Sequence, residues 1–268
     1  MSQTHLIIGA GKMGGALIRG WLEAGTVSAR KLAILDPHLG TDAVYAVEKG
    51  AVHIEGASDI PDTVQTILLA VKPQMVTEIG GRIGGALPTK ARLISVLAGT
   101  SIAELTRLFG ERPIIRAMPN TPAAIGAGIT AITGDVSNAD MEVAETLLTA
   151  VGEVIRVESE NQIDAVTAIS GSGPAYVFYM CETMEAAAKQ LGLPDEKAAA
   201  FARQTIIGAA ALLKESGAAA DVLRKNVTSP NGTTQAALDV LMDLDGLAPL
   251  MSKATRAAYK RAEDLAKS

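Results

Sequence analysis

Hydrophobic residues fill short runs in the first 160 residues, and each run stops at a glycine, a proline or a charged residue. The runs are HLIIGAG, KLAILD, TILLAV, RLISVLAG, PIIRAMP, AGITAITG and GEVIRVE. The first five are apolar with few exceptions rather than alternating, which is typical of strands in a parallel sheet covered on both faces. The last two look like later strands. Helical patterns lie between them, as in Lys12–Gly25 and around Met141–Val151. This alternation predicts an α/β fold with a doubly wound, mostly parallel sheet.

From about residue 161 the strand-like runs nearly vanish and alanine becomes abundant. Helices are expected near 174–191, 194–216, 233–244 and 248–266, with prolines and glycines at their ends. We therefore predict two domains, 1–160 and 161–268, the second all-helical. The second of these helices is apolar on most of its surface, which indicates burial. A bundle of this size cannot cover it alone, so we expect subunits to pack together there.

The composition excludes several classes of function. A formal net charge of −5 and a pI near 5.3 argue against a nucleic-acid partner, which favours basic proteins. No apolar run has the length of a membrane span, and no signal peptide is expected. Cys181, the single cysteine, can form no intramolecular disulfide, and no metal site is predicted. A reducing cytoplasm fits this pattern.

A glycine-rich turn follows the first run: Gly9, Ala10, Gly11, Lys12, Met13 and Gly14. Between a strand and a helix, such a turn binds the pyrophosphate of a dinucleotide, and the helix N-terminus favours its charge. Asp36 ends the second run at the spacing expected for an acid that binds a ribose. The pattern predicts a Rossmann domain that binds NAD(P)H. The alternatives are a turn chosen for packing and an Asp36 that only caps a turn.

Three further loops lie where predicted strands end, the edge at which ligands bind in open parallel sheets. The first holds Ala70, Val71, Lys72 and Pro73, and the second holds Ala98 and Gly99. The third holds Asn120 between two prolines. The amide of Asn120 either faces the nicotinamide or caps the following turn. Lys72 is either a ligand contact or a solvated residue.

All three histidines lie in the first 53 residues, and none is in the helical half. Oxidation of an alcohol needs a general base near the hydroxyl, often His or Lys. Reduction of an imine has less need of a general base, because the substrate nitrogen can arrive protonated. The protein then supplies positioning and a hydrogen bond to that nitrogen. The chain therefore favours an imine reductase.

Two loops of the helical half supply hydroxyl groups just before helices. ISGSGPAYVF holds Ser170 and Ser172, and TSPNGTTQAAL holds Ser229, Thr233 and Thr234. A substrate carboxylate would bind the backbone N–H groups at such helix N-termini. The backbone N–H groups of Gly232, Thr233 and Thr234 lie at the second of these expected helix starts. Simple N-capping by Ser and Thr is the alternative.

In order and spacing, GAGKMG, AVKPQ, RAMPNTP, SGSGPAYVF and NVTSPNGTTQAAL resemble pyrroline-5-carboxylate reductase over almost the whole chain. The last motif, which starts at Asn226, is the specific one. The resemblance implies reduction of 1-pyrroline-5-carboxylate to L-proline, the last step of proline biosynthesis. It also implies a C-terminal dimerisation domain, often a decamer of five dimers, and substrate binding at Ser229–Thr234. With this substrate, we predict that the amides of Gly232, Thr233 and Thr234 hold the carboxylate and that the Thr234 hydroxyl bonds the ring nitrogen. This chain has Asn231 where most members have Gly, and Asn tolerates the left-handed conformation that the turn needs.

Two other functions share a Rossmann domain with this pattern. A β-hydroxyacid dehydrogenase would carry a lysine near Ala175–Phe178, and this chain has none before Lys189. A sensor that binds NAD(P)H without turnover would share the fold.

The carboxylate of Asp36 also predicts cofactor preference. It would accept hydrogen bonds from the ribose of NADH but would repel the phosphate of NADPH. The following stretch, DPHLGTDAVYAVE, contains no Arg or Lys. We expect NADH to be preferred and NADPH to remain usable.

Overall fold

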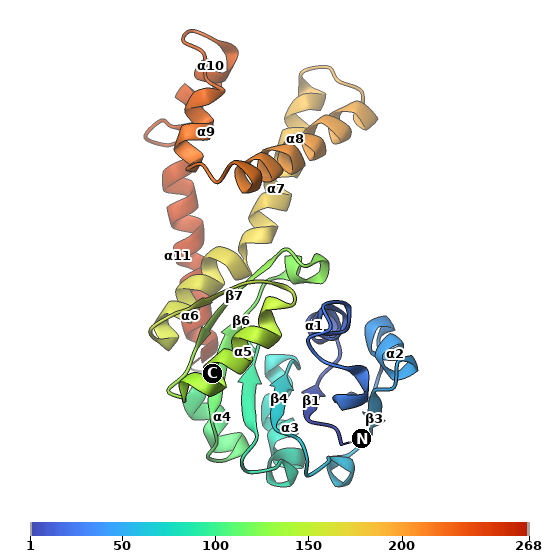
Figure 1. The fold of residues 1–268 in the computed structure, drawn as a ribbon. Helices are drawn as coiled ribbons and strands as arrows, with labels where there is room; N and C mark the ends of the chain where they lie inside the picture. Colours follow the sequence, from blue (N-terminus) through green and yellow to red (C-terminus); the bar gives the residue numbers. More distant parts are fainter. Residues whose placement is uncertain (1, 267–268) are drawn as a thin grey trace. The chain divides into compact units, whose positions relative to one another are not determined.

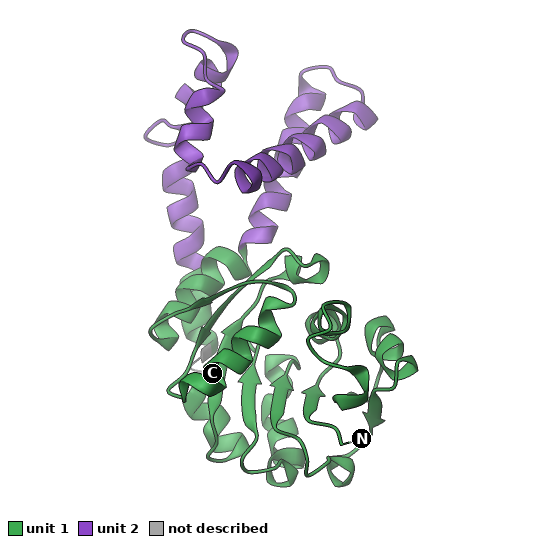
Figure 2. Ribbon diagram, in the orientation of Figure 1, with its two compact units in different colours: residues 1–172, 258–268 green, residues 173–257 purple. Residues whose placement is uncertain are grey.

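The computed structural model describes residues 2–266, and the chain divides into two compact units (Figure 2). The sheet unit comprises residues 1–172 and 258–268, and the helical unit comprises residues 173–257. Each unit is described by itself. The predicted domain limit at residue 160 stays a prediction.

The sheet unit contains one eight-stranded sheet in the order β3-β2-β1-β4-β5-β6-β7-β8 (Figure 1). Every neighbouring pair is parallel except β6 and β7, so the prediction of a mostly parallel sheet is confirmed. β7 and β8 run opposite to the other six. The short edge strand β3 was not predicted. The strands are β1 His5–Ile8, β2 Leu32–Leu35, β3 Val52–Ile54, β4 Thr66–Leu69, β5 Arg92–Ser95, β6 Ile114–Met118, β7 Gly128–Thr133 and β8 Gly152–Arg156.

Five α-helices and several single turns connect these strands, and a sixth helix, α6, follows β8. The helices are α1 Lys12–Glu23, α2 Thr41–Glu48, α3 Val76–Ile83, α4 Ile102–Phe109, α5 Asn138–Thr149 and α6 Glu160–Val166. The 3₁₀ turns are η1 Ala29–Lys31, η2 Ala57–Asp59, η3 Pro73–Met75, η4 Gly84–Ala86 and η5 Thr121–Ile125. A π-helical turn, η6 Thr167–Gly171, directly continues α6 and was not predicted.

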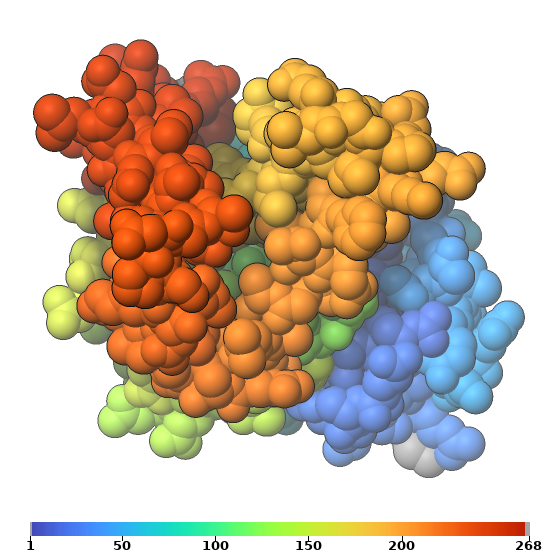
Figure 3. Space-filling view, turned by 90° about the horizontal axis from the view of Figure 1, so that it is seen from above, coloured from blue at the N-terminus to red at the C-terminus, as the bar shows by residue number. Residues whose placement is uncertain are grey.

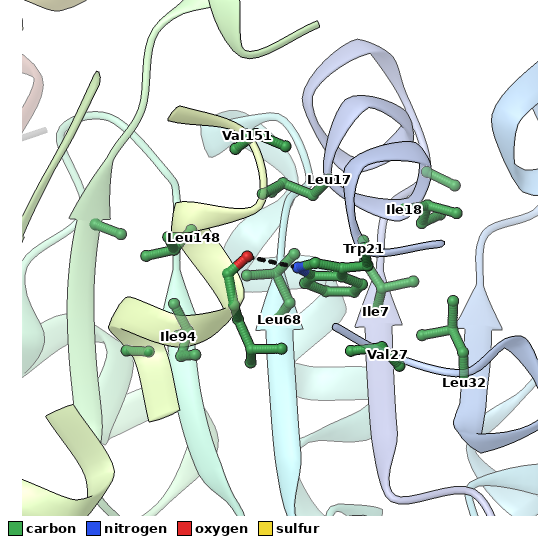
Figure 4. Close-up of a cluster of buried hydrophobic side chains, with 14 of the residues drawn as sticks. Ile7, Leu17, Ile18, Trp21, Val27, Leu32, Leu68, Ile94, Leu148 and Val151 are labelled. Carbon is green, nitrogen blue, oxygen red and sulfur yellow. Dashed lines mark hydrogen bonds between the residues drawn. The ribbon is translucent and has the colours of Figure 1, made fainter. Parts of the chain in front are cut away.

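Successive residues of each central strand enter two different cores, because side chains alternate across a sheet. Ile7 belongs to the core under α1 and α5, whereas Leu6 and Ile8 belong to the core under α3 and α4. Trp21 of α1 is 1% exposed in the first core, and its indole N–H donates to the carbonyl of Leu147 at 2.7 Å (Figure 4). The wholly apolar runs of the sequence thus reflect burial on both faces.

The helical unit contains α7 Gly173–Gln190, α8 Asp195–Ser216, α9 Ala220–Asn226, α10 Thr233–Leu241 and the first part of α11 Leu247–Ala266. α7 and α8 pack against each other as a pair. The four predicted helices are present, and the short α9 was not predicted. The last part of α11 belongs to the sheet unit, where Leu265 packs beside Gly99.

Candidate cofactor and substrate sites

The glycine-rich turn joins β1 to α1, and its three glycines meet different surroundings. Gly9 has a φ of +92°, which L side chains rarely adopt. A Cβ on Gly14 would lie 2.1 Å from the carbonyl oxygen of Gly9, so only glycine allows α1 to pack this close. A Cβ on Gly11 would meet nothing within 4 Å. The surface over Gly11 is therefore open, as a bound pyrophosphate requires.

Charge at this turn also suits a phosphate. Gly11 is the N-cap of α1 and makes no side-chain cap, and the first turn of α1 contains no acidic residue. Lys12 and Met13 follow, the first exposed and the second half-buried. An uncapped helix N-terminus with open space in front of it fits the pyrophosphate of NAD(P)H.

Asp36 lies just after β2, and both oxygens of its carboxylate bind backbone amides. Oδ2 accepts the N–H of Ala10 at 2.6 Å, and Oδ1 accepts the N–H of His38 at 2.8 Å. The bond to His38 closes the turn after Pro37, which is the capping role weighed above. The bond to Ala10 directs the carboxylate toward the glycine-rich turn, and each oxygen keeps a second lone pair for a ligand.

The loops after β4 and β5 lie at the same sheet edge as the glycine-rich turn. The N–H of Ala70 donates to the carbonyl of Ile8 at 2.8 Å, which holds the loop of Ala70, Val71, Lys72 and Pro73 beside β1. Lys72 is exposed, and its side chain makes no hydrogen bond or ion pair within the described residues. Ala98 and Gly99 follow β5, and both are half-buried.

Asn120 follows β6, and its side chain has a structural partner. Its Oδ1 accepts the N–H of Ile129 in β7 at 3.0 Å. This bond fixes the amide plane and leaves the NH₂ group able to donate. The side chain therefore does not cap the following turn, since η5 has no side-chain cap, and the NH₂ group is the end of the amide that can reach a ligand.

A buried arginine in β6 was missed from the sequence. Arg116 has a side chain only 3% exposed, and it forms ion pairs with Glu160 and Asp164 of α6 at 2.9 and 3.3 Å. The signal was present as a lone charge in the apolar run PIIRAMP, but its partners lie more than 40 residues away in the sequence. α6 leads through the π-helical turn to Ser172, which is half-buried.

The helical unit holds the second group of predicted residues around the start of α10. Asn226 ends α9 and is exposed, as is Ser229. The N–H of Gly232 donates to the carbonyl of Ser229 at 3.0 Å, which closes a tight turn through Pro230 and Asn231. Asn231 takes the left-handed conformation, with a φ of +59°, as expected for Asn at this position.

The amide of Gly232 is used in that turn, so the helix offers the amides of Thr233 and Thr234 as donors. Gly232 is the N-cap and provides no side-chain cap, and the first turn of α10 is free of acidic residues. Within the described residues, the hydroxyls of Thr233 and Thr234 make no hydrogen bond. This arrangement can bind a carboxylate and place a hydroxyl beside it.

Residues 2–266 contain neither a metal site nor a membrane-spanning helix. No group of three His, Cys, Asp or Glu side chains is placed to hold a metal ion. No helix in this part of the chain is long and apolar enough to cross a membrane.

Comparison with known families matches both halves of the chain. The family model for pyrroline-5-carboxylate reductase dimerisation matches residues 160–265. A second model, described as NADP oxidoreductase, coenzyme F420-dependent, matches residues 5–99. The helical region and the dinucleotide-binding region are thus matched independently.

Similarity to individual proteins covers nearly the whole chain. A pyrroline-5-carboxylate reductase of Pseudomonas aeruginosa is 38% identical, with 97% of this chain and 95% of the relative covered. The solved structure of a pyrroline-5-carboxylate reductase from Coxiella burnetii is 33% identical with a TM-score of 0.90, and 99% of each chain is covered. That of a Plasmodium falciparum pyrroline carboxylate reductase with NADP bound is 26% identical with a TM-score of 0.83, over 98% of each chain. The chain belongs to the pyrroline-5-carboxylate reductase family.

Proposed function

We propose that this chain reduces 1-pyrroline-5-carboxylate to L-proline with NAD(P)H. Membership of the family supports the reaction, and the uncapped start of α10 with its pair of threonine hydroxyls is the observation that carries the substrate site. The assay is loss of NAD(P)H absorbance with and without 1-pyrroline-5-carboxylate. Turnover that depends on this substrate is expected. Cofactor binding without turnover would instead indicate a sensor.

The bound dinucleotide supplies the hydride. The protein's part is to bind and orient. The glycine-rich turn, with Gly9, Gly11 and Gly14, receives the pyrophosphate at the start of α1. The cofactor site continues along the sheet edge. It is completed by Lys12, Met13, the loops at Ala70–Pro73 and Ala98–Gly99, and the NH₂ group of Asn120.

Substrate binding falls to the helical unit and to Ser172. The amides of Thr233 and Thr234 hold the carboxylate, with Asn226, Ser229 and Gly232 shaping the turn. The hydroxyl of Thr234 bonds the ring nitrogen as it changes from iminium to amine. No general base is needed for this step, and His5, His38 and His53 all lie in the sheet unit.

A β-hydroxyacid dehydrogenase is the second candidate, and the structure offers it no catalytic lysine. The first turns of α7 carry Ala175, Tyr176, Val177 and Phe178, and Lys189 lies in the last turn paired with Glu185. No observation favours this reaction.

Preference for NADH is the part of the proposal that rests on Asp36. Its carboxylate points toward the glycine-rich turn, where a ribose phosphate would approach it. Unit charges 4 Å apart interact by about 1 kcal/mol in water and about 4 kcal/mol at an effective dielectric constant of 20. The nearest arginine on α1 cannot compensate freely, because Arg19 pairs with Asp42 at 3.0 Å and lies over the ring of Tyr45.

Steady-state kinetics with both cofactors at low salt should give a kcat/KM for NADH about tenfold above that for NADPH, or about 1.4 kcal/mol. Asp36→Ser should narrow this gap, chiefly by lowering the KM for NADPH. Asp62→Ser removes an equal charge from an exposed site and should leave the ratio unchanged. A wild-type preference for NADPH would contradict the role given to Asp36.

Self-association through the helical unit completes the proposal, with a dimer as the basic unit and a decamer of five dimers as the larger assembly. Large apolar side chains of α7, α8 and α10 are exposed in the single chain, among them Phe178 at 63%, Phe201 at 62% and Val240 at 72%. The surface from α8 to α10 runs from gold to orange-red in Figure 3. This exposure agrees with the sequence pattern of α8, most of whose apolar residues stay exposed although the helix packs against α7.

Cys181, which has no disulfide partner in the chain, suits a reducing compartment such as the cytoplasm.

Light scattering at micromolar concentration should find the full chain at least dimeric. Phe201→Glu should shift it toward monomer, because a carboxylate would have to be buried in the interface. Gln204→Glu adds the same charge on the same helix at another exposed position, and its smaller effect would show that the Phe201 side chain itself is buried. A monodisperse wild-type monomer would rule out the assembly.

A further inference from the structure

One buried charge has no part in the binding steps above. Arg116 lies in the middle of β6, and its guanidinium reaches α6 on one side of the sheet. Nη1 donates to Oε1 of Glu160 at 2.9 Å, and Nη2 donates to Oδ1 of Asp164 at 3.3 Å. Nε is buried without an acceptor among the described residues. Because a buried ion group is costly to desolvate, a hydrophobic pair would serve stability at least as well.

The carboxylates extend this cluster to two more elements. Oε1 of Glu160 also accepts the N–H of Ile102, the first residue of α4, at 2.9 Å. On α11, the charge of Glu263 is the main cause that raises the pKa of the Tyr259 phenol, and the charge of Asp164 contributes. The side chains of Glu160 and Asp164 are one helical turn apart and therefore face β6 together.

The two elements joined by Arg116 both continue into the proposed site. β6 leads through Met118 and Pro119 to Asn120, four residues after Arg116. α6 continues without a break into the π-helical turn, which the N–H of Ser172 closes by donating to the carbonyl of Thr167 at 2.9 Å. π-Helical turns occur frequently at functional sites.

The end of β6 and the π-helical turn also contact each other, beyond the ion pairs of Arg116. A Cβ on Gly171 would lie 2.9 Å from Cε of Met118, so the π-helical turn rests against the end of β6. The two segments that lead to Asn120 and Ser172 are thus joined by two contacts, the apolar one at Met118 and the ionic one at Arg116.

We infer that the ion pairs of Arg116 with Glu160 and Asp164 form a clamp that fixes the cofactor loop at Asn120 relative to the substrate residue Ser172. Arg116 touches neither ligand, so it is a positioning residue. The inference rests on the proposed function for the roles of Asn120 and Ser172. Its physical basis is that a shift of about 1 Å between reacting groups can slow a reaction by about 100-fold.

Asp164→Asn is the main test, because it removes one charge of the clamp and keeps the side-chain shape. Asp140→Asn is the matched control. Asp140 pairs with Arg92, another strand arginine, at 2.8 Å, but Arg92 begins β5 and lies at the opposite edge of the sheet from the loops. Both variants lose one arginine–carboxylate pair, but only Asp164→Asn removes a pair that Arg116 forms.

Hydrogen exchange of the ligand-free chain is the first readout. In Asp164→Asn, peptides covering 116–130 and 165–175 should both exchange faster, whereas Asp140→Asn should change neither. The second readout is the isotope effect on kcat with deuterated NADH. Asp164→Asn should lower kcat roughly fivefold to tenfold with a larger isotope effect and little change in the Kd for NADH, because hydride transfer becomes slower.

The inference is overturned if only the 165–175 peptide responds, or if kcat and the isotope effect match those of Asp140→Asn. If Asp164→Asn does not fold, Glu160→Gln at a half-buried position is measured instead, with the same expectations. Arg116→Lys should give exchange rates and a kcat between those of the wild-type chain and those of Asp164→Asn. Failure of the wild-type chain to turn over 1-pyrroline-5-carboxylate would refute the proposed function. The exchange experiment would still decide on the clamp, since it needs no substrate.

Discussion

Gly14→Ala should unfold far more easily than the wild-type chain and should lose NADH binding. The new Cβ would lie 2.1 Å from the Gly9 carbonyl oxygen and 3.4 Å from the Cβ of Ala70. The obstacle is backbone, so relief requires α1 to move away from β1 and to disturb the core around Trp21. We expect the free energy of unfolding to fall by about 3 kcal/mol, at the upper end for overpacked sites. Urea unfolding and NADH fluorescence titration measure the two effects.

Gly11→Ala separates stability from binding in the same turn. Gly11 has an ordinary φ of −69°, and its Cβ would enter open space. Unfolding should change by less than about 1 kcal/mol, the scale of an N-cap substitution. The Kd for NADH should still rise by about 30-fold, or about 2 kcal/mol, because the methyl group occupies the space of the pyrophosphate. Wild-type affinity in Gly11→Ala would mean that the cofactor does not pass over this residue.

Thr234→Ala should lower kcat/KM by about 1.5–3 kcal/mol, the scale of a hydrogen bond to a charged group. The hydroxyl has no partner within the described residues, so its removal costs the fold nothing, and alanine is a good helix former. The Kd for NADH should hardly change. Steady-state kinetics and cofactor titration on the same preparation measure both quantities.

Two variants make this test specific. Thr234→Ser keeps the hydroxyl and should recover most of the activity. Thr146→Ala removes an exposed helical threonine of α5, whose hydroxyl bonds only the carbonyl of Glu142, and should leave kcat/KM unchanged. If Thr234→Ala turns over at the wild-type rate with a normal fold, this hydroxyl does not bind the ring nitrogen.

Local sequence patterns predicted most of the fold because the strands are buried on both faces. β1, β2 and β4 read as unbroken apolar runs for that reason. β3 was missed because it is only three residues long, with Val52 exposed, His53 half-buried and only Ile54 buried. The π-helical turn was missed because no local pattern distinguishes it from a continuing α-helix, and its contact with Met118 joins residues far apart in the sequence.

In the candidate site, too, local features could be predicted from the sequence, and contacts between distant residues could not. Gly14 and Asn231 were predictable, because steric limits on a glycine-rich turn and on a left-handed residue act within a few positions. The second bond of Asp36, to Ala10, and the partners of Arg116 join residues 26 to 48 positions apart. Such contacts follow from the order of strands in the sheet. A single charged residue in an apolar run indicates that a partner exists, but not which one.

Trp21 is the single tryptophan of the chain, and it is enclosed in the core of the sheet unit. Its intrinsic emission therefore responds when α1 leaves the sheet and carries no signal from the helical unit. Far-ultraviolet circular dichroism, by contrast, includes the long helices α7 and α8. The two spectroscopic transitions coincide only if both units melt together. An optical label already built into the polypeptide thus distinguishes cooperative denaturation from stepwise denaturation without any chemical modification.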